Sequence, residues 1–137
     1  MPSNSRKVRG RRTEHVVAAY FQQFWEAARA VNSGASGSDV LGTPFMVEVK
    51  SRKDFSPLAW VKQNEKRDDS RFKFVVYRAN GMGEDAERYL FICRLGDVMP
   101  FLTEQVPSDE IARCKGCGSW TIVSRVCEVC KVIGYNK

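Results

Sequence analysis

Residues 45–50 read Phe-Met-Val-Glu-Val-Lys, and this stretch decides the fold that we expect. Successive side chains of a β-strand point to opposite faces, so the phenylalanine and the two valines share one face. Glu48 and Lys50 then lie together on the opposite face, with the backbone of Val49 between them. The stretch therefore predicts a strand with one apolar side and one side that carries a carboxylate and an ammonium group.

Helices and further strands are predicted on either side of this strand. Apolar residues at helical spacing predict a first helix, which Thr13 can cap at its N-terminus. Ser56 and Pro57 are typical of the N-cap and first turn of a second helix. The predicted helices cover residues 13–31, 57–66 and 97–104, and the further strands cover residues 72–78 and 89–95. This order predicts an α/β protein in which helices flank a mixed sheet.

Composition divides the chain into three parts. Residues 1–12 contain five Arg or Lys residues beside Gly and Ser and contain no acid, so we expect a flexible basic arm. Residues 13–106 contain the predicted sheet and helices and are expected to form the main domain. Residues 107–137 contain four of the five cysteines and are expected to form a separate tail.

The overall size and charge narrow the class of protein. The chain has 137 residues, enough for one globular core, and a net charge of +6. An excess of Lys and Arg favours a polyanionic partner such as nucleic acid, although many soluble proteins are mildly basic. No apolar run approaches the roughly 20 residues of a membrane span, and no apolar segment follows the basic N-terminus as in a secretory signal. We therefore expect a cytoplasmic protein, from a prokaryote or a phage-infected host cell, with no membrane partner.

Acidic residues near Glu48 suggest metal-dependent chemistry on a phosphate. Cleaving a phosphodiester at neutral pH needs a nucleophilic water and stabilised phosphate charge, and hard ions bound by carboxylate and carbonyl oxygens supply both. Asp39 lies upstream of the strand, where a tight turn over residues 42–44 can bring it beside Glu48. Glu14 lies at the end of the apolar stripe of the first helix and points towards the core, whereas Glu26 lies off that stripe.

The run Glu48-Val49-Lys50, with Asp39 before it and Glu14 in the first helix, resembles the PD-(D/E)XK nucleases, and most closely the archaeal-type Holliday junction resolvases. The resemblance implies a restriction-endonuclease-like fold and a homodimeric endonuclease that cuts branched DNA with Mg²⁺ or Mn²⁺. It makes Asp39, Glu48 and the carbonyl of Val49 the metal ligands. It also makes Lys50 the catalytic cation and Glu14 a further catalytic carboxylate.

Basic and polar residues around this motif are candidate DNA contacts. They are Arg9, Arg11 and Arg12 of the arm, and Ser51, Arg52 and Lys53 after the strand. A solvated terminus and a solvated turn are the alternatives. Gln63, on the second predicted helix, lies either near the site or at the surface.

Two departures from the family leave the substrate open. Ser38 stands before Asp39 where the family has proline, and the spacing from Asp39 to Glu48 is short. A repair, restriction-like or phage DNA-processing nuclease on non-junction DNA is therefore the second enzymatic interpretation. The non-enzymatic alternative is a zinc-ribbon nucleic-acid-binding protein in which Glu48 and Lys50 are only structural.

The tail contains two Cys-x-x-Cys pairs, Cys114 with Cys117 and Cys127 with Cys130. Each pair provides two thiolates from one tight turn, so four sulfurs can surround a Zn²⁺ ion tetrahedrally. A redox-active motif is the alternative, but it would need only one pair. We therefore expect a small zinc ribbon with a structural Zn²⁺, which serves folding and can also dock on DNA.

Overall fold

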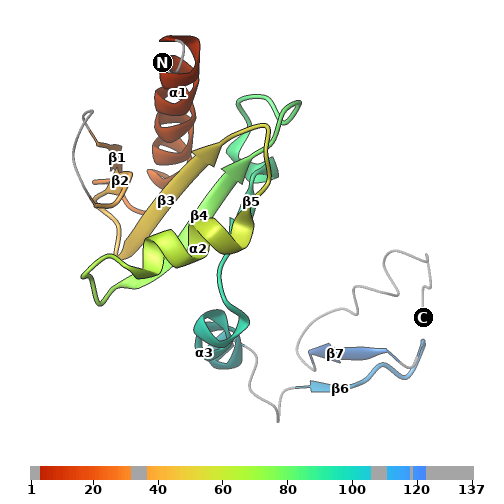
Figure 1. The fold of residues 1–137 in the computed structure, drawn as a ribbon. Coiled ribbons are helices and arrows are strands. Elements are labelled where there is room, and N and C mark those ends of the chain that lie inside the picture. Colours follow the sequence, from red (N-terminus) through yellow and green to blue (C-terminus); the bar gives the residue numbers. More distant parts are fainter. Residues whose placement is uncertain (1–3, 32–36, 106–110, 118, 123–137) are drawn as a thin grey trace. The chain divides into compact units, whose positions relative to one another are not determined.

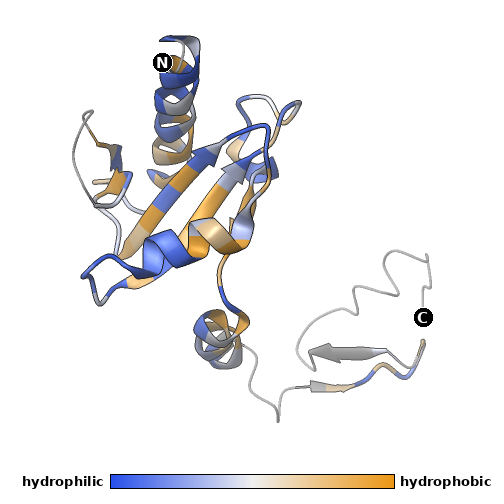
Figure 2. Ribbon diagram, in the orientation of Figure 1, coloured by the Kyte–Doolittle hydropathy of each residue, from blue (hydrophilic) through white to orange (hydrophobic). Residues whose placement is uncertain are grey.

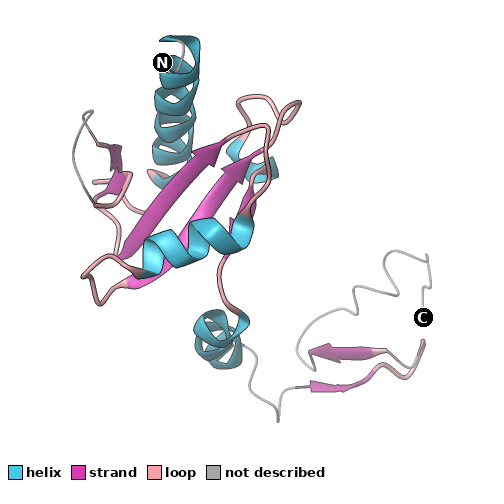
Figure 3. Cartoon of the chain, in the orientation of Figure 1, coloured by secondary structure: helices cyan, strands magenta, loops and turns pink. Residues whose placement is uncertain are grey.

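The computed structural model describes residues 4–31, 37–105, 111–117 and 119–122. The chain divides into two compact units, residues 1–94 and residues 95–137. Across the described residues the main elements are three α-helices and a three-stranded mixed sheet (Figures 1 and 3). The expected α/β class with a mixed sheet is therefore confirmed.

Helix α1 begins at Asn4 and ends at Phe21, rather than running from Thr13 to residue 31 as predicted. Most of the segment expected to be a flexible arm is therefore helical, since Arg and Lys are good helix formers. Thr13 lies inside the helix, where its hydroxyl donates to the carbonyl of Arg9 at 3.0 Å. Its predicted role as an N-cap is wrong for this reason.

The chain leaves the helix after Phe21 because aromatic rings there pack against each other and against the sheet. The Trp25 ring lies edge-on to the Phe21 ring at 5.8 Å and to the Phe45 ring at 5.2 Å between centroids. Beyond this turn, strand β1 (Arg29–Ala30) pairs antiparallel with β2 (Val40–Leu41). A continuous helix would carry Trp25 away from Phe45, and the helical spacing of the sequence does not reveal this contact.

The sheet consists of β3 (Phe45–Ser51), β4 (Phe72–Arg78) and β5 (Leu90–Ile92) in the order β3-β4-β5. Strand β3 runs parallel to β4, and β5 runs antiparallel to β4. Two parallel neighbours need a crossover, and helix α2 (Pro57–Glu65) lies in this one. The first two predicted strands and the second helix are confirmed. The last strand is shorter than predicted, and Ser56 makes no side-chain capping bond to α2.

Different helices cover the two faces of this sheet. On one face, Val17 of α1 packs in a core with Val47 and Val49 of β3. On the other face, Trp60 of α2 packs with Tyr77 of β4. Figure 2 shows hydrophobic residues along the strands, interrupted by hydrophilic residues on β3, and hydrophilic residues along the first half of α1. Both faces of β3 are therefore inside the protein.

The second unit contains helix α3 (Leu95–Gln105) and a hairpin of β6 (Ile111–Arg113) and β7 (Trp120–Ile122). The predicted third helix is confirmed, and it lies in the unit that begins at residue 95. Residues 111–113, within the segment expected to form the tail, form β6 and pair with β7. Among the described helices, none is long and apolar enough to cross a membrane.

Candidate functional site

The outer edge of β3 is held by the segment that contains Ser38 and Asp39. The Asp39 N–H donates to the Val47 carbonyl at 2.7 Å, and the Ser38 hydroxyl accepts from the Val47 N–H at 2.9 Å. The same hydroxyl donates to the Val40 carbonyl at 2.7 Å. Asp39 Oδ2 in turn accepts from the Val49 N–H at 2.8 Å. These bonds fix the Asp39 carboxylate beside β3, on the side away from β4.

A tight turn at Gly42 makes the short connection from Asp39 to β3 possible. Gly42 has a φ of +77°, and a Cβ there would overlap the backbone carbonyl of Ala27, so only glycine fits. The Thr43 hydroxyl accepts from the Phe45 N–H at 3.3 Å, where β3 begins. The predicted turn therefore does bring Asp39 back beside the strand.

The carbonyl of Val49 faces the same edge as Asp39. In a strand, the N–H and the C=O of one residue point to the same side. Because the Val49 N–H donates to Asp39 rather than to β4, its carbonyl also points away from β4. A carbonyl oxygen is therefore available beside the Asp39 carboxylate.

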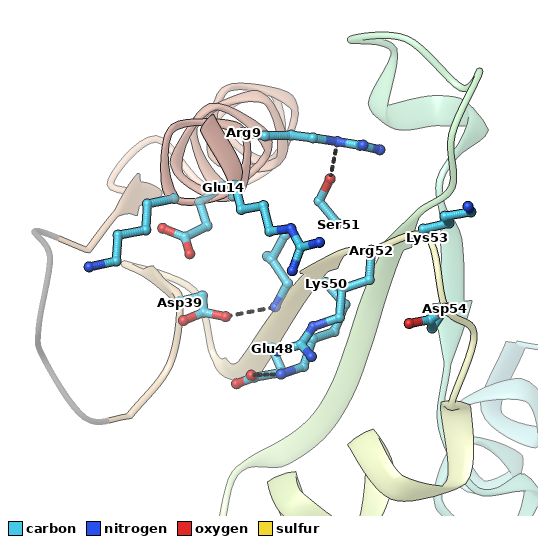
Figure 4. Close-up of a pocket in the computed structure, with 13 residues that line it drawn as sticks. Arg9, Glu14, Asp39, Glu48, Lys50, Ser51, Arg52, Lys53 and Asp54 are labelled. Atoms are coloured by element: carbon cyan, nitrogen blue, oxygen red, sulfur yellow. Dashed lines mark hydrogen bonds and ion pairs between the residues drawn. The ribbon is translucent and has the colours of Figure 1, made fainter. Parts of the chain in front are cut away.

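One cavity of about 590 Å³ collects most of the residues predicted from the sequence (Figure 4). Helix α1 forms one wall, β3 forms the floor, and the loop after β3 forms the opposite wall. Its lining comprises Arg6, Lys7, Arg9, Gly10, Glu14, Asp39, Glu48, Val49, Lys50, Ser51, Arg52, Lys53 and Asp54. All four predicted catalytic residues therefore meet at one place.

Glu48 and Lys50 lie on the α2 side of β3 and are buried, with exposed fractions of 5% and 7%. Lys50 Nζ lies 2.9 Å from Glu48 Oε1 and donates to Gln63 Oε1 on α2 at 3.3 Å. Arg67, in the loop after α2, places Nη2 2.7 Å from Glu48 Oε2. Buried charges are tolerated only when they are paired, and these contacts neutralise Glu48 with two cations.

Asp39 and Glu14 are less well neutralised than Glu48. Burial, followed by the negative charge of Glu48, raises the pKa of Asp39 from its ordinary value of 3.8 to about 7. The same two causes, in the same order, raise the pKa of Glu14, while Arg11 lowers it. The charge of Glu14 also raises the pKa of Asp39. The three carboxylates therefore repel one another across the cavity, and a bound cation would relieve this repulsion.

The predicted DNA-contact residues divide into two groups. Arg9, Ser51, Arg52 and Lys53 line the cavity, and Arg9 Nε donates to Ser51 Oγ at 3.0 Å (Figure 4). Arg11 and Arg12 are not among the described lining residues. Arg11 acts on Glu14 through its charge, and Arg12 Nε pairs with Glu84 at 3.3 Å.

Sequence analysis missed Arg6, Lys7 and Arg67. Arg6 and Lys7 lie one helical turn before Arg9 and Gly10, so a helix that begins at Asn4 would have placed them on the cavity side. Arg67 lies 19 residues after Glu48, in a run of mixed charge, and no local spacing signals its ion pair. Gln63, for which a location near the site and one at the surface were open, is exposed and accepts a hydrogen bond from Lys50 Nζ at 3.3 Å.

As the side chains stand, no three His, Cys, Asp or Glu residues in the described part of the chain form a ready metal-binding group. Glu48 instead turns its carboxylate towards Lys50 and Arg67. The residues that can hold a hard cation at this cavity are Asp39, Glu48 and the carbonyl of Val49. Glu14 lies close enough for its charge to raise the pKa of Asp39.

In the second unit, the first cysteine pair lies at the turn of the β6–β7 hairpin. Arg113 pairs with Trp120 at the end of the hairpin, and the Cys114 N–H donates to the Ser119 carbonyl at 2.7 Å. The Gly116 N–H donates to Cys114 Sγ at 3.4 Å. Cys117 also lies in this turn. The second pair, Cys127 and Cys130, lies outside the described residues.

No family model matches the chain, and neither a curated protein nor a solved structure matches it. The function is therefore argued from the chemistry of the site.

Proposed function

We propose that this chain is a Mg²⁺-dependent endonuclease that cleaves phosphodiester bonds in DNA. The observation that carries the proposal is a single cavity that collects Glu14, Asp39, Glu48 and Lys50 between basic walls. Carboxylates, a backbone carbonyl and a lysine are the groups that metal-dependent phosphodiester hydrolysis uses. Basic walls suit a substrate with a phosphate backbone.

The donor set at the cavity suits Mg²⁺ or Mn²⁺. Asp39, Glu48 and the Val49 carbonyl provide hard oxygen ligands, which these ions prefer. The raised pKa values of Asp39 and Glu14 support a cation site, because a cation favours the ionised form of both groups. Glu48 has to release at least one of its two cationic partners to bind a metal.

The other residues of the cavity have separate roles in this proposal. A metal held by Asp39, Glu48 and the Val49 carbonyl would supply Lewis-acid activation of water and would neutralise charge on the phosphate. Lys50, oriented by Gln63, can donate a hydrogen bond to a phosphate oxygen as negative charge develops there. Glu14, with its raised pKa, can accept a proton from the attacking water. Arg52 and Lys53 can position the DNA backbone.

The substrate and the assembly rest on the family resemblance. It favours branched DNA, such as a four-way junction, cut by a homodimer with one active site in each subunit. The parallel pairing of β3 and β4, with Glu48 opposite Val75, supports a restriction-endonuclease-like sheet. A repair, restriction-like or phage DNA-processing nuclease on non-junction DNA is the alternative for the same site.

For the tail we propose a Cys₄ zinc ribbon formed by Cys114, Cys117, Cys127 and Cys130. The bond from the Gly116 N–H to Cys114 Sγ supports it, because such bonds stabilise a thiolate in a metal-binding turn. A closed site with four sulfur ligands has no open position for substrate, so this Zn²⁺ is structural.

A non-catalytic nucleic-acid-binding protein is the second candidate function. Its support is the fully paired Glu48 carboxylate, which both Lys50 and Arg67 neutralise. Buried ion pairs of this kind also occur in proteins without a metal site. In that case the cavity would bind phosphates and cut nothing.

Cleavage of labelled DNA separates these proposals. We expect the purified protein to cut a four-way junction in Mg²⁺ and not in EDTA, and Glu48→Gln to abolish cutting. Glu65→Gln is the control, because Glu65 is an exposed carboxylate that pairs with Arg94. Cleavage of linear duplex at the same rate would favour the alternative substrate. Tight binding without cleavage, in both Mg²⁺ and Mn²⁺, would overturn the enzymatic proposal.

A further inference from the structure

Phe55 is an exposed aromatic residue directly beside the cavity. It follows Arg52, Lys53 and Asp54, which line the cavity wall formed by the loop after β3 (Figure 4). Its exposed fraction is 57%. Phe55 is therefore an aromatic residue that directly follows a basic segment of the cavity wall.

The Phe55 ring is supported from beneath by two buried rings. Its centroid lies 5.0 Å from the Tyr77 ring, with an interplanar angle of 37°, and 5.8 Å from the Trp60 ring, with an angle of 76°. Trp60 and Tyr77 are themselves 5.0 Å apart. The Tyr77 hydroxyl donates to the Arg52 carbonyl at 3.1 Å, so the loop is tied to the sheet as well. The ring is therefore held in place while its outer side stays open.

Exposure alone does not distinguish Phe55 from other residues of the first unit. Phe24 and Phe91 are similarly exposed, at 60% and 53%, and single exposed aromatic residues are common in soluble proteins. Neither Phe24 nor Phe91 adjoins a residue that lines the cavity. Phe55 alone among these three combines an open ring, a rigid support and a neighbouring basic wall.

The charge of the cavity indicates which ligand would reach this ring. Of the 13 described lining residues, six are Lys or Arg and four are Asp or Glu. Five of these six basic residues lie in two groups, at the start of α1 and in the loop that leads to Phe55, and Lys50 lies on β3. A phosphodiester chain that follows such walls brings bases alongside, and aromatic rings stack on bases of any sequence.

We propose that Phe55 is a stacking site for an unpaired nucleobase of DNA whose backbone lies in the cavity. This inference rests on the proposed function and names its substrate class: DNA with an unpaired base beside the bound phosphate, as in a flap, a splayed arm or an opened junction. In a continuous duplex both faces of each base are covered by its neighbours, so the ring has no partner there.

Fluorescence of 2-aminopurine tests the inference without cleavage. The base analogue is placed in the single-stranded arm of a splayed duplex, and Ca²⁺ replaces Mg²⁺ so that binding can be measured alone. We expect the wild type to quench the fluorophore. Phe55→Leu should abolish the quenching and weaken binding of the splayed DNA about tenfold, since stacking contributes substantially for each base. Binding of blunt duplex should not change.

Leucine is chosen because it keeps Trp60 and Tyr77 covered while removing the aromatic face. Phe55→Tyr should retain quenching, and Phe24→Leu, which removes an equally exposed ring elsewhere, should behave as the wild type. If Phe55→Leu binds and quenches as the wild type does, the stacking site is wrong while the nuclease proposal stands. If it changes only the oligomeric state, Phe55 is a protein contact and the inference is overturned. If the wild type binds no DNA at all, both the nuclease proposal and the inference fail.

Discussion

The two faces of β3 are equally buried and chemically opposite. Val47 and Val49 pack against α1 in an apolar core, whereas Glu48 and Lys50, only 5% and 7% exposed, lie under α2. Burial of the valines stabilises the fold through the hydrophobic effect. Burial of the charges gains little, because desolvation offsets most of the attraction between them. Our proposal gives these two charges a use beyond stability, in metal binding and DNA cleavage.

Among substitutions of the basic residues, Lys50→Met should have the largest effect. Methionine retains most of the side-chain volume but cannot stabilise phosphate charge, so we expect the rate of DNA cleavage to fall by about 10²–10³-fold. Glu48 keeps its ion pair with Arg67, and the protein should stay folded. Single-turnover cleavage and circular dichroism measure the two effects. Lys62→Met, on the exposed side of α2, is the control, and an equal loss of activity there would remove the argument for Lys50.

Asp39→Asn should separate activity from stability at the edge of the same strand. In the folded protein the pKa of Asp39 is raised from 3.8 to about 7, so its ionised form is disfavoured. The protonated Asp39 side chain therefore makes its full contribution to the stability of the fold below pH 3.8, and this contribution is lost as the pH rises towards 7. The amide still accepts from the Val49 N–H but carries no charge. We expect cleavage to be abolished while metal-free stability at pH 8 rises.

This gain in stability should reach about 4 kcal/mol at most, since each pKa unit corresponds to about 1.4 kcal/mol. It should be smaller at pH 5 than at pH 8. Denaturant unfolding in EDTA at the two pH values measures it. A gain that is equal at both pH values would show that the charge of Asp39 is not its cause.

Val47→Ala tests the apolar face of β3, where a substitution should affect stability rather than activity. Val47 is fully buried, so losing two methyl groups should lower the free energy of unfolding by about 2–3 kcal/mol. The cleavage rate of the folded fraction should change little, because Val47 is not among the described residues that line the cavity. Denaturant unfolding and activity at 15 °C test both parts. A large loss of activity in fully folded protein would mean that the two faces are not functionally distinct.

Lys53→Gln should have the smallest effect of these changes. Lys53 lines the cavity and can neutralise one phosphate, so DNA affinity should fall several-fold and the slope of log affinity against log salt should decrease by about one. Arg12→Gln should change both less, because Arg12 pairs with Glu84 outside the described lining. Titrations at several salt concentrations compare the two. Equal losses of DNA affinity in the two variants would mean that Arg12 also contacts the DNA.

The parts of the fold that could be predicted are those with strong local patterns. Alternation in β3 and the Ser56-Pro57 signal located the strand and α2, and the site residues on β3 followed from period-two geometry. Helix α1 was misplaced at both ends, because its start depends on charged residues without an apolar stripe. Its end depends on the packing of Trp25 against Phe45. Contacts of this kind, between residues far apart in the chain, leave no mark in local spacing.

The same limit applies to the candidate site. Glu14, Asp39, Glu48 and Lys50 were predicted because the motif and helical phase mark them. Arg67 was not, because its bond to Glu48 closes only when the loop after α2 folds back on the sheet. The hydroxyl of Ser38 was noted only as a departure from the family, yet it ties the segment that carries Asp39 to β3.

Mn²⁺ binding, followed by electron paramagnetic resonance on protein already loaded with zinc, tests the central claim most directly. If the buried charges of β3 serve a metal site, the wild type binds Mn²⁺ at neutral pH, Glu48→Gln and Asp39→Asn lose that binding, and Glu65→Gln retains it. Binding that is unchanged in Glu48→Gln, or no binding in the wild type with or without DNA, would contradict the claim and leave the Glu48–Lys50–Arg67 cluster as a structural ion pair.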